Sequence, residues 1–183
     1  MKTYISLLRG INVSGQNKIR MPEQKELYES LALVNVVTYI QSGNVLFDCV
    51  EQDPTRLVKS IEAEIERSFG TSVRVFLRDK NQFQKIIDSN PYIYQRNEDP
   101  EKLHVTFLSD LPSASRLTNL HLPVGSSDEF QLFDKEIYLF CPNGYGRTKI
   151  SNSYFERKLS VAATTRNWKT VKALSEIAKQ RRP

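Results

Sequence analysis

The order of short apolar segments and amphipathic helices most constrains what this chain can fold into. Residues 3–9 form an apolar run typical of a buried strand, and a helix is expected at 22–33, where a proline opens the first turn. Two more strands are expected at 35–41 and 44–48, joined by a Ser-Gly turn. The chain therefore begins with the order strand, helix, strand, strand.

The strongest local pattern is the helix expected at 54–69. Asp53 is placed to cap its N-terminus, and Gly70 is placed to end it. Its apolar stripe consists of Leu57, Val58, Ile61, Ile65 and Phe69. A strand expected at 72–78 then completes the order βαββαβ, which is the ferredoxin-like split unit.

The same order begins again after a helix expected at 80–89 and a loop at 90–92. The later elements are expected at 103–108 (strand), 113–121 (short helix), 130–133 and 137–141 (hairpin), 153–159 (helix), 161–164 (strand) and 167–179 (helix). Ser153 and Glu156 match a capping box. We predict an α+β fold of two ferredoxin-like halves packed as one compact unit, at 1–79 and 102–183, with 80–101 as connecting helix and loop.

Composition and charge narrow the classes of protein to which the chain can belong. With 183 residues and 39% hydrophobic residues, a packed core is expected rather than disorder. The first apolar run is too short for a signal peptide, and no segment approaches the roughly eighteen apolar residues of a membrane helix. We therefore expect a cytoplasmic protein with no membrane partner.

The charge is unevenly distributed along the chain. Residues 142–183 carry ten Lys and Arg against two Asp and Glu, whereas residues 1–141 carry sixteen against nineteen. A basic surface of this kind favours an anionic partner, either a small molecule or a nucleic acid. The run of basic residues at 179–182 is of the terminal kind that is usually solvated.

Residue types that mark common catalytic and metal sites are scarce. Cys49 and Cys141 have no neighbouring ligands at metal-site spacing, so we read them as thiols that fill space. His104 and His121 are the only histidines, and neither lies in a Ser/His/Asp or Cys/His pattern. We expect His104 to be a half-buried structural residue. No metal or cofactor is expected, no catalytic residue can be named, and whether the chain is an enzyme is left open.

The first of three polar loops follows the first strand, at residues 9–18. Its two glycines have the spacing of a phosphate-binding loop, but the required Lys-Ser/Thr pair is missing, which argues against a nucleotide triphosphatase. Two interpretations are left. The asparagines satisfy the loop's own backbone, or Arg9, Asn12 and Lys18 help to bind an anion.

The second polar loop precedes the helix expected at 153–159. It contains Asn143, Tyr145, Arg147 and Lys149, and it leads into a helix N-terminus, where unsatisfied N–H groups favour phosphate or carboxylate. The alternative interpretation is a plain turn, although a turn does not need the aromatic surface of a tyrosine between two glycines.

The third polar loop begins the last helix, with Arg166, Asn167 and Trp168. The tryptophan either anchors that helix in the core or stacks on a planar ligand. Ferredoxin-like units also include RNA-recognition modules, but the strands at 44–48 and 137–141 lack the glycine-aromatic pattern of such a module. A standard module of that type is therefore not expected.

Six short motifs occur together along nearly the whole chain. They are LRGINV (8–13), YIQSGNV (39–45), NPY (90–92), HVTFL (104–108), YGRTK (145–149) and TTRNW (164–168). In this combination the chain resembles the bacterial domain-of-unknown-function family 1697. The resemblance implies a compact α+β fold of two ferredoxin-like halves, and it implies no activity, substrate or catalytic residue.

Three functional hypotheses follow from these observations. The leading one is a binding protein whose three polar loops converge in one cationic pocket for an anionic, phosphate-bearing ligand such as a nucleotide or RNA. A second is an enzyme of unrecognised type acting on a small anionic metabolite, which predicts a deep pocket with a lysine or tyrosine of lowered pKa. A third is a homodimeric interaction protein, in which the basic region docks on the acidic region of a second copy.

Overall fold

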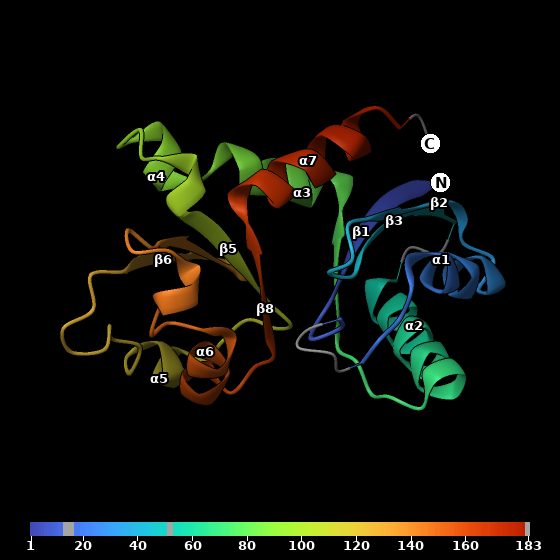
Figure 1. Cartoon of the computed structure of the whole chain (residues 1–183), viewed down its shortest axis with the longest axis horizontal. Coiled ribbons are helices and arrows are strands. Elements are labelled where there is room, and N and C mark those ends of the chain that lie inside the picture. Colours follow the sequence, from blue (N-terminus) through green and yellow to red (C-terminus); the bar gives the residue numbers. More distant parts are fainter. Residues whose placement is uncertain (13–16, 51–52, 182–183) are drawn as a thin grey trace. The chain divides into compact units, whose positions relative to one another are not determined.

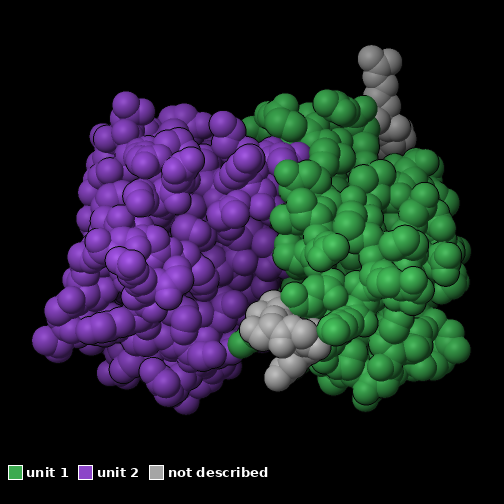
Figure 2. All heavy atoms as spheres, viewed as in Figure 1, with its two compact units in different colours: residues 1–85, 174–183 green, residues 86–173 purple. Residues whose placement is uncertain are grey.

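The computed structural model describes residues 1–12, 17–50 and 53–181, which fall into two compact units. Unit 1 comprises Met1–Lys85 and Leu174–Pro183, and unit 2 comprises Ile86–Ala173 (Figure 2). These limits divide the last helix between the units. The division into 1–79, 80–101 and 102–183 stays a prediction.

The first half has the predicted ferredoxin-like order. Its elements are β1 (Lys2–Leu8), α1 (Met21–Ser30), β2 (Val34–Tyr39), β3 (Asn44–Cys49), α2 (Pro54–Phe69), β4 (Val75–Asp79) and α3 (Lys80–Asp88). The strands form one sheet in the order β2-β3-β1-β4, and every neighbouring pair is antiparallel. Helices α1 and α2 lie against the same face of this sheet (Figure 1).

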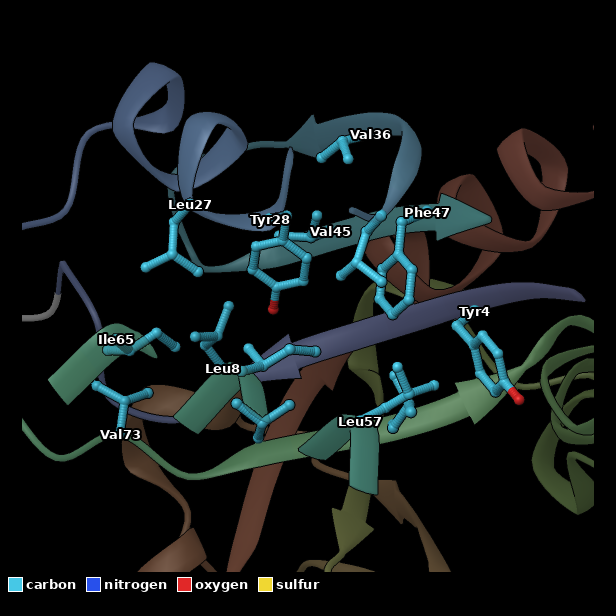
Figure 3. Close-up of a cluster of buried hydrophobic side chains, with 14 of the residues drawn as sticks. Tyr4, Leu8, Leu27, Tyr28, Val36, Val45, Phe47, Leu57, Ile65 and Val73 are labelled. Atoms are coloured by element: carbon cyan, nitrogen blue, oxygen red, sulfur yellow. The ribbon is translucent and has the colours of Figure 1, made fainter. Parts of the chain in front are cut away.

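The core of unit 1 lies between that face and the two helices (Figure 3). Every second residue of β1 points into it, including Tyr4 and Leu8, as expected for a strand with one face toward a helix layer. The buried hydroxyl of Tyr28 on α1 is 2.7 Å from Ser6 Oγ, so a polar group inside the core is satisfied. Helix α2 begins and ends where the sequence predicts: Asp53 accepts a hydrogen bond from the Thr55 amide, and Gly70 has φ +64°.

The second half repeats the order. Its elements are α4 (Pro91–Tyr94), η1 (Pro100–Lys102), β5 (Leu103–Leu108), α5 (Ala114–Leu117), β6 (Glu129–Phe133), β7 (Glu136–Phe140), η2 (Tyr145–Arg147), α6 (Asn152–Leu159), β8 (Ala163–Asn167) and α7 (Trp168–Lys179). The second sheet has the order β6-β7-β5-β8, again antiparallel throughout. The predicted α+β fold of two βαββαβ halves is confirmed.

Among the local predictions that are wrong, two concern helix starts, and a further one is the helix expected at 113–121, which is only α5 (Ala114–Leu117). The expected loop at 90–92 opens the short helix α4, because the side chain of Asn90 accepts a hydrogen bond from the Tyr92 amide and caps it. Helix α6 is capped by Ser151 rather than by Ser153, and the carboxylate of Glu156 accepts the Ala163 amide instead of closing a capping box. In the second case the glutamate that the local motif assigned to the cap binds the first residue of the following strand, seven positions along the chain.

Candidate functional site

The candidate residues of the first loop lie in unit 1, where the asparagine has a structural role. Asn12 has φ +54°, its Oδ1 accepts the Ile19 amide at 3.0 Å, and its Nδ2 donates to the carbonyls of Ile19 and Gln41. These bonds fit the interpretation in which an asparagine satisfies the loop's own backbone. Lys18 is exposed and Arg9 is half-buried. Residues 13–16, which include the second glycine of the phosphate-loop spacing, lie outside the described residues.

The other seven candidate residues belong to unit 2, so the convergence of all three loops stays a prediction. Within unit 2, His104 connects the second and third loops. Its ring stacks on Tyr145, with centroids 4.8 Å apart and planes inclined by 25°, and in the sheet it pairs with Asn167 across β5 and β8. We use the name Tyr145 site for Tyr145, His104, Arg147, Arg166 and Asn167.

His104 is the buried floor of the Tyr145 site. His104 is only 9% exposed, and its Nδ1 has no hydrogen-bond partner within the described part of the chain. Burial lowers the pKa of His104, while the nearby carbonyl of Lys102 partly opposes the shift. The imidazole is therefore neutral near pH 7, and Nδ1 is a polar atom that a hydrogen-bonding group could still satisfy.

Arg166 supplies a buried positive charge on the sheet face opposite to His104, because it pairs with Val105 whereas His104 pairs with Asn167. The residue is 8% exposed, and Nη1 donates to Thr164 Oγ1 at 2.8 Å and to the Thr165 carbonyl at 2.9 Å. Burial lowers the pKa of Arg166 to about 10, and the electrostatic interaction with Tyr145 opposes that shift. The guanidinium is still charged at neutral pH, and its field reaches the phenol ring.

The remaining cations of the second loop lie at its surface. Arg147 is exposed two residues after Tyr145. The segment that precedes β6 holds this loop in place, because Asn143 Nδ2 donates to Ser127 Oγ at 2.8 Å and Lys149 Nζ lies 3.4 Å from the Val124 carbonyl. Asn143 and Lys149 therefore help to hold the loop in place, and Arg147 is exposed within it.

The residues predicted as a third loop lie instead at the end of β8 and the start of α7, which follow each other directly. Asn167 Oδ1 accepts the Thr170 amide at 2.8 Å, which is the hydrogen bond of a helix N-cap. Trp168 is only 3% exposed, as expected if it anchors the helix rather than stacking on a ligand. Lys169 in the first turn of α7 is exposed. The aromatic surface available near this helix start is therefore that of Tyr145.

The two halves repeat the framework of the site but not its aromatic pair. In unit 1 Arg78 is also buried, with Nη1 2.9 Å from the preceding carbonyl, and Asp79 accepts the Gln82 amide as Asn167 accepts the Thr170 amide. Tyr4, paired with Asp79, stands where unit 2 has His104. The buried arginine and the helix cap are thus features of the repeated fold, whereas the stacked imidazole and phenol distinguish unit 2.

Several other kinds of site find no support in the described residues. No group of three or more His, Cys, Asp or Glu side chains that could hold a metal ion occurs there. Four tyrosines have a raised pKa, with burial as the largest cause: Tyr28, Tyr92, Tyr138 and Tyr154. Among helices of the described part, none has the length and apolar character needed to cross a membrane.

Sequence reasoning did not bring His104 into the site. The residue is separated from Tyr145 by about forty positions, and no local motif indicates that their rings stack. The alternation of β5 placed His104 on one face of the sheet, but the loop that covers this face could not be identified from periodicity. Only the packing of η2 over β5 reveals the pair.

Comparison with known proteins supports the family and the fold. The model of a family described as "Protein of unknown function (DUF1697)" matches residues 1–138, so the chain belongs to that family. The conserved bacterial protein SP0830 from Streptococcus pneumoniae has a similar structure, with a TM-score of 0.74 at 21% sequence identity, over 97% of this chain and 98% of the other. Among proteins with curated descriptions, none matches.

Proposed function

We propose that this member of the DUF1697 family binds a small phosphate-bearing ligand with a planar group, of the mononucleotide class, at the Tyr145 site. The observation that carries the proposal is the half-buried ring of Tyr145, which stacks on a buried neutral imidazole and interacts electrostatically with the buried guanidinium of Arg166. A ring held in this way can stack on a nucleobase at little entropic cost, because its orientation is already set.

The phosphate binds where exposed positive charge and amide groups lie close to that ring. Arg147 is exposed two residues beyond Tyr145, and Lys169 is exposed in the first turn of α7, whose N-terminus carries a partial positive charge. The buried guanidinium of Arg166, which interacts electrostatically with Tyr145, adds to the same positive field. The carboxylate of Asp128 accepts a hydrogen bond from Thr148 in the same loop and reduces this field, so we expect modest affinity.

The two histidines of the chain provide an internal comparison for the test. His104 lies under Tyr145, whereas His121 is exposed outside the site. Adenosine and guanosine monophosphate are titrated into the protein while the imidazole protons of both residues are followed by NMR. We expect a saturable shift of the His104 signals, a constant His121 signal, and an affinity that falls as salt is raised.

Three substitutions locate the ligand. Tyr145→Ala is expected to weaken binding about tenfold, since stacking on an aromatic ring contributes about 1–3 kcal/mol per base. Arg147→Gln should weaken binding less and reduce its dependence on salt. Lys158→Gln removes a charge from α6 of the same unit and serves as the matched control. If the His104 signals do not move, or if Lys158→Gln has the same effect as Arg147→Gln, the proposal is wrong.

A further inference from the structure

A cavity of about 540 Å³ in unit 1 shares no lining residue with the Tyr145 site of unit 2. It is lined by the segment that joins α1 to β2, by the end of β3 and by the first half of α2. This volume falls within the range of about 300–1,000 Å³ that is typical of small-molecule sites. Within the described part of the chain, every residue that lines the cavity belongs to unit 1.

The floor of the cavity is apolar. Leu33, Leu57 and Ile61 line it and are each no more than 6% exposed, and the thiol of Cys49 lies among them. Leu57 belongs to the buried cluster of this unit (Figure 3). Apolar walls of this kind favour an alkyl chain, which is removed from water as it enters.

The rim of the cavity is cationic. Arg56 and Lys59 line it from α2, together with the hydroxyl of Ser60. Both cations lie in the first half of the helix, where positive charge does not stabilise the helix dipole. Arg56 lies 3.6 Å from the carboxylate of Asp53, but its side chain is 78% exposed, whereas Lys59 forms no ion pair with any residue in the described ranges.

We infer that this cavity binds a small amphipathic carboxylate, a linear alkyl acid whose chain fills the apolar floor and whose carboxylate meets Lys59 and Arg56. The apolar floor excludes a fully hydrophilic anion, and the cationic rim disfavours an alkylammonium ion. The carboxylate also accepts a hydrogen bond from Ser60, whose hydroxyl lines the same rim. The inference does not depend on the ligand proposed for the Tyr145 site.

The test uses octanoate, hexanoate and octanol with the full chain, by calorimetry and by protection of Cys49 from alkylation. Each methylene placed in the cavity should tighten binding about fourfold, so octanoate should bind about fifteen times more tightly than hexanoate. Octanoate should slow the alkylation of Cys49. Cys141, which is fully buried in unit 2, provides the reference thiol for mass spectrometry.

Two variants in the cavity and one control variant distinguish this site from nonspecific apolar binding. Lys59→Gln should weaken octanoate about twofold to fivefold and leave octanol unchanged, because an exposed charge pair contributes little more than this. Lys85→Gln removes an exposed charge from α3 of unit 1 and should change neither ligand. Ser60→Phe fills the cavity from an exposed helix position and should abolish the binding of both ligands while the far-UV circular dichroism spectrum is retained.

The outcomes that overturn the inference are equally specific. One is octanoate that neither binds saturably nor slows the alkylation of Cys49. Another is octanoate binding that Lys59→Gln and Ser60→Phe leave unchanged. Equal affinity for octanoate and octanol, with no effect of Lys59→Gln, would also overturn it, because the cationic rim would then have no part in recognition.

Discussion

The ion pair of Arg181 with Asp48 allows a quantitative prediction about unit 1. Asp48 on β3 is 1% exposed, accepts a hydrogen bond from Thr3 Oγ1 at 2.6 Å, and lies 3.5 Å from Arg181 Nη1. Arg181 Nη2 also donates to the Asn35 carbonyl at 2.8 Å. Burial lowers the pKa of Arg181 and the nearby Asp48 carboxylate opposes the shift, so the charged pair is held in a desolvated place.

We expect Arg181→Met to lower the free energy of unfolding by about 3 kcal/mol. Methionine retains an apolar stem but leaves the Asp48 carboxylate buried without its counter-charge, and removal of one partner from a buried pair costs about 3–5 kcal/mol. The lower end of this range applies because Arg181 Nη1 lacks a well-directed hydrogen bond within the described part of the chain. Arg56→Met, which removes an exposed partner of Asp53, should cost less than about 1 kcal/mol.

The measurement is urea denaturation followed by far-UV circular dichroism, with Asp48→Asn and the double variant completing a cycle. The double variant should be more stable than the sum of the single losses predicts, with a coupling energy of about 2 kcal/mol. Because the pair is buried, added salt should change this coupling little. A loss below about 0.5 kcal/mol in Arg181→Met together with zero coupling would refute the reasoning.

Three further predictions concern a turn, a titration and a helix cap. Gly43→Ala should lower the free energy of unfolding by about 2–4 kcal/mol in urea denaturation, because φ is +74° and an added Cβ would lie 2.7 Å from a core side chain. Gly70→Ala should lower it by only about 1 kcal/mol, because no atom lies within 4 Å of an added Cβ there. Equal losses for the two variants would contradict this reasoning. Because the pKa of His104 is lowered in the folded protein, the unfolded chain takes up a proton on His104 at a higher pH than the folded chain does. The free energy of unfolding should therefore fall as the pH drops below about 6.5. His104→Phe should remove this pH dependence from denaturation curves. Ser151→Ala should lower the free energy of unfolding by about 1 kcal/mol, and Ser153→Ala by about half that or less. A larger loss in Ser153→Ala than in Ser151→Ala would instead support a capping box that begins at Ser153.

The sequence by itself determined much of the local structure and the topology. Helix α2 was predicted at its observed bounds because a cap, a repeated apolar stripe and a terminal glycine all act within one turn of the residues that they affect. The βαββαβ order was predictable twice over, since alternation and helical periodicity are properties of neighbouring residues. The position of Asn12 in its own loop backbone was one of two interpretations that the sequence had left open.

Only the tertiary structure decided which distant side chains meet. Arg181 belongs to a basic run expected in solvent, yet it lies against a carboxylate more than a hundred residues earlier in the chain. His104 and Tyr145 stack through the packing of a loop on a strand, and the cavity beside Lys59 depends on how a helix meets a turn and a strand end. Hydrophobic periodicity in the sequence does not indicate such contacts, because it reports only on neighbouring residues. These contacts form when elements far apart in the sequence pack together in three dimensions.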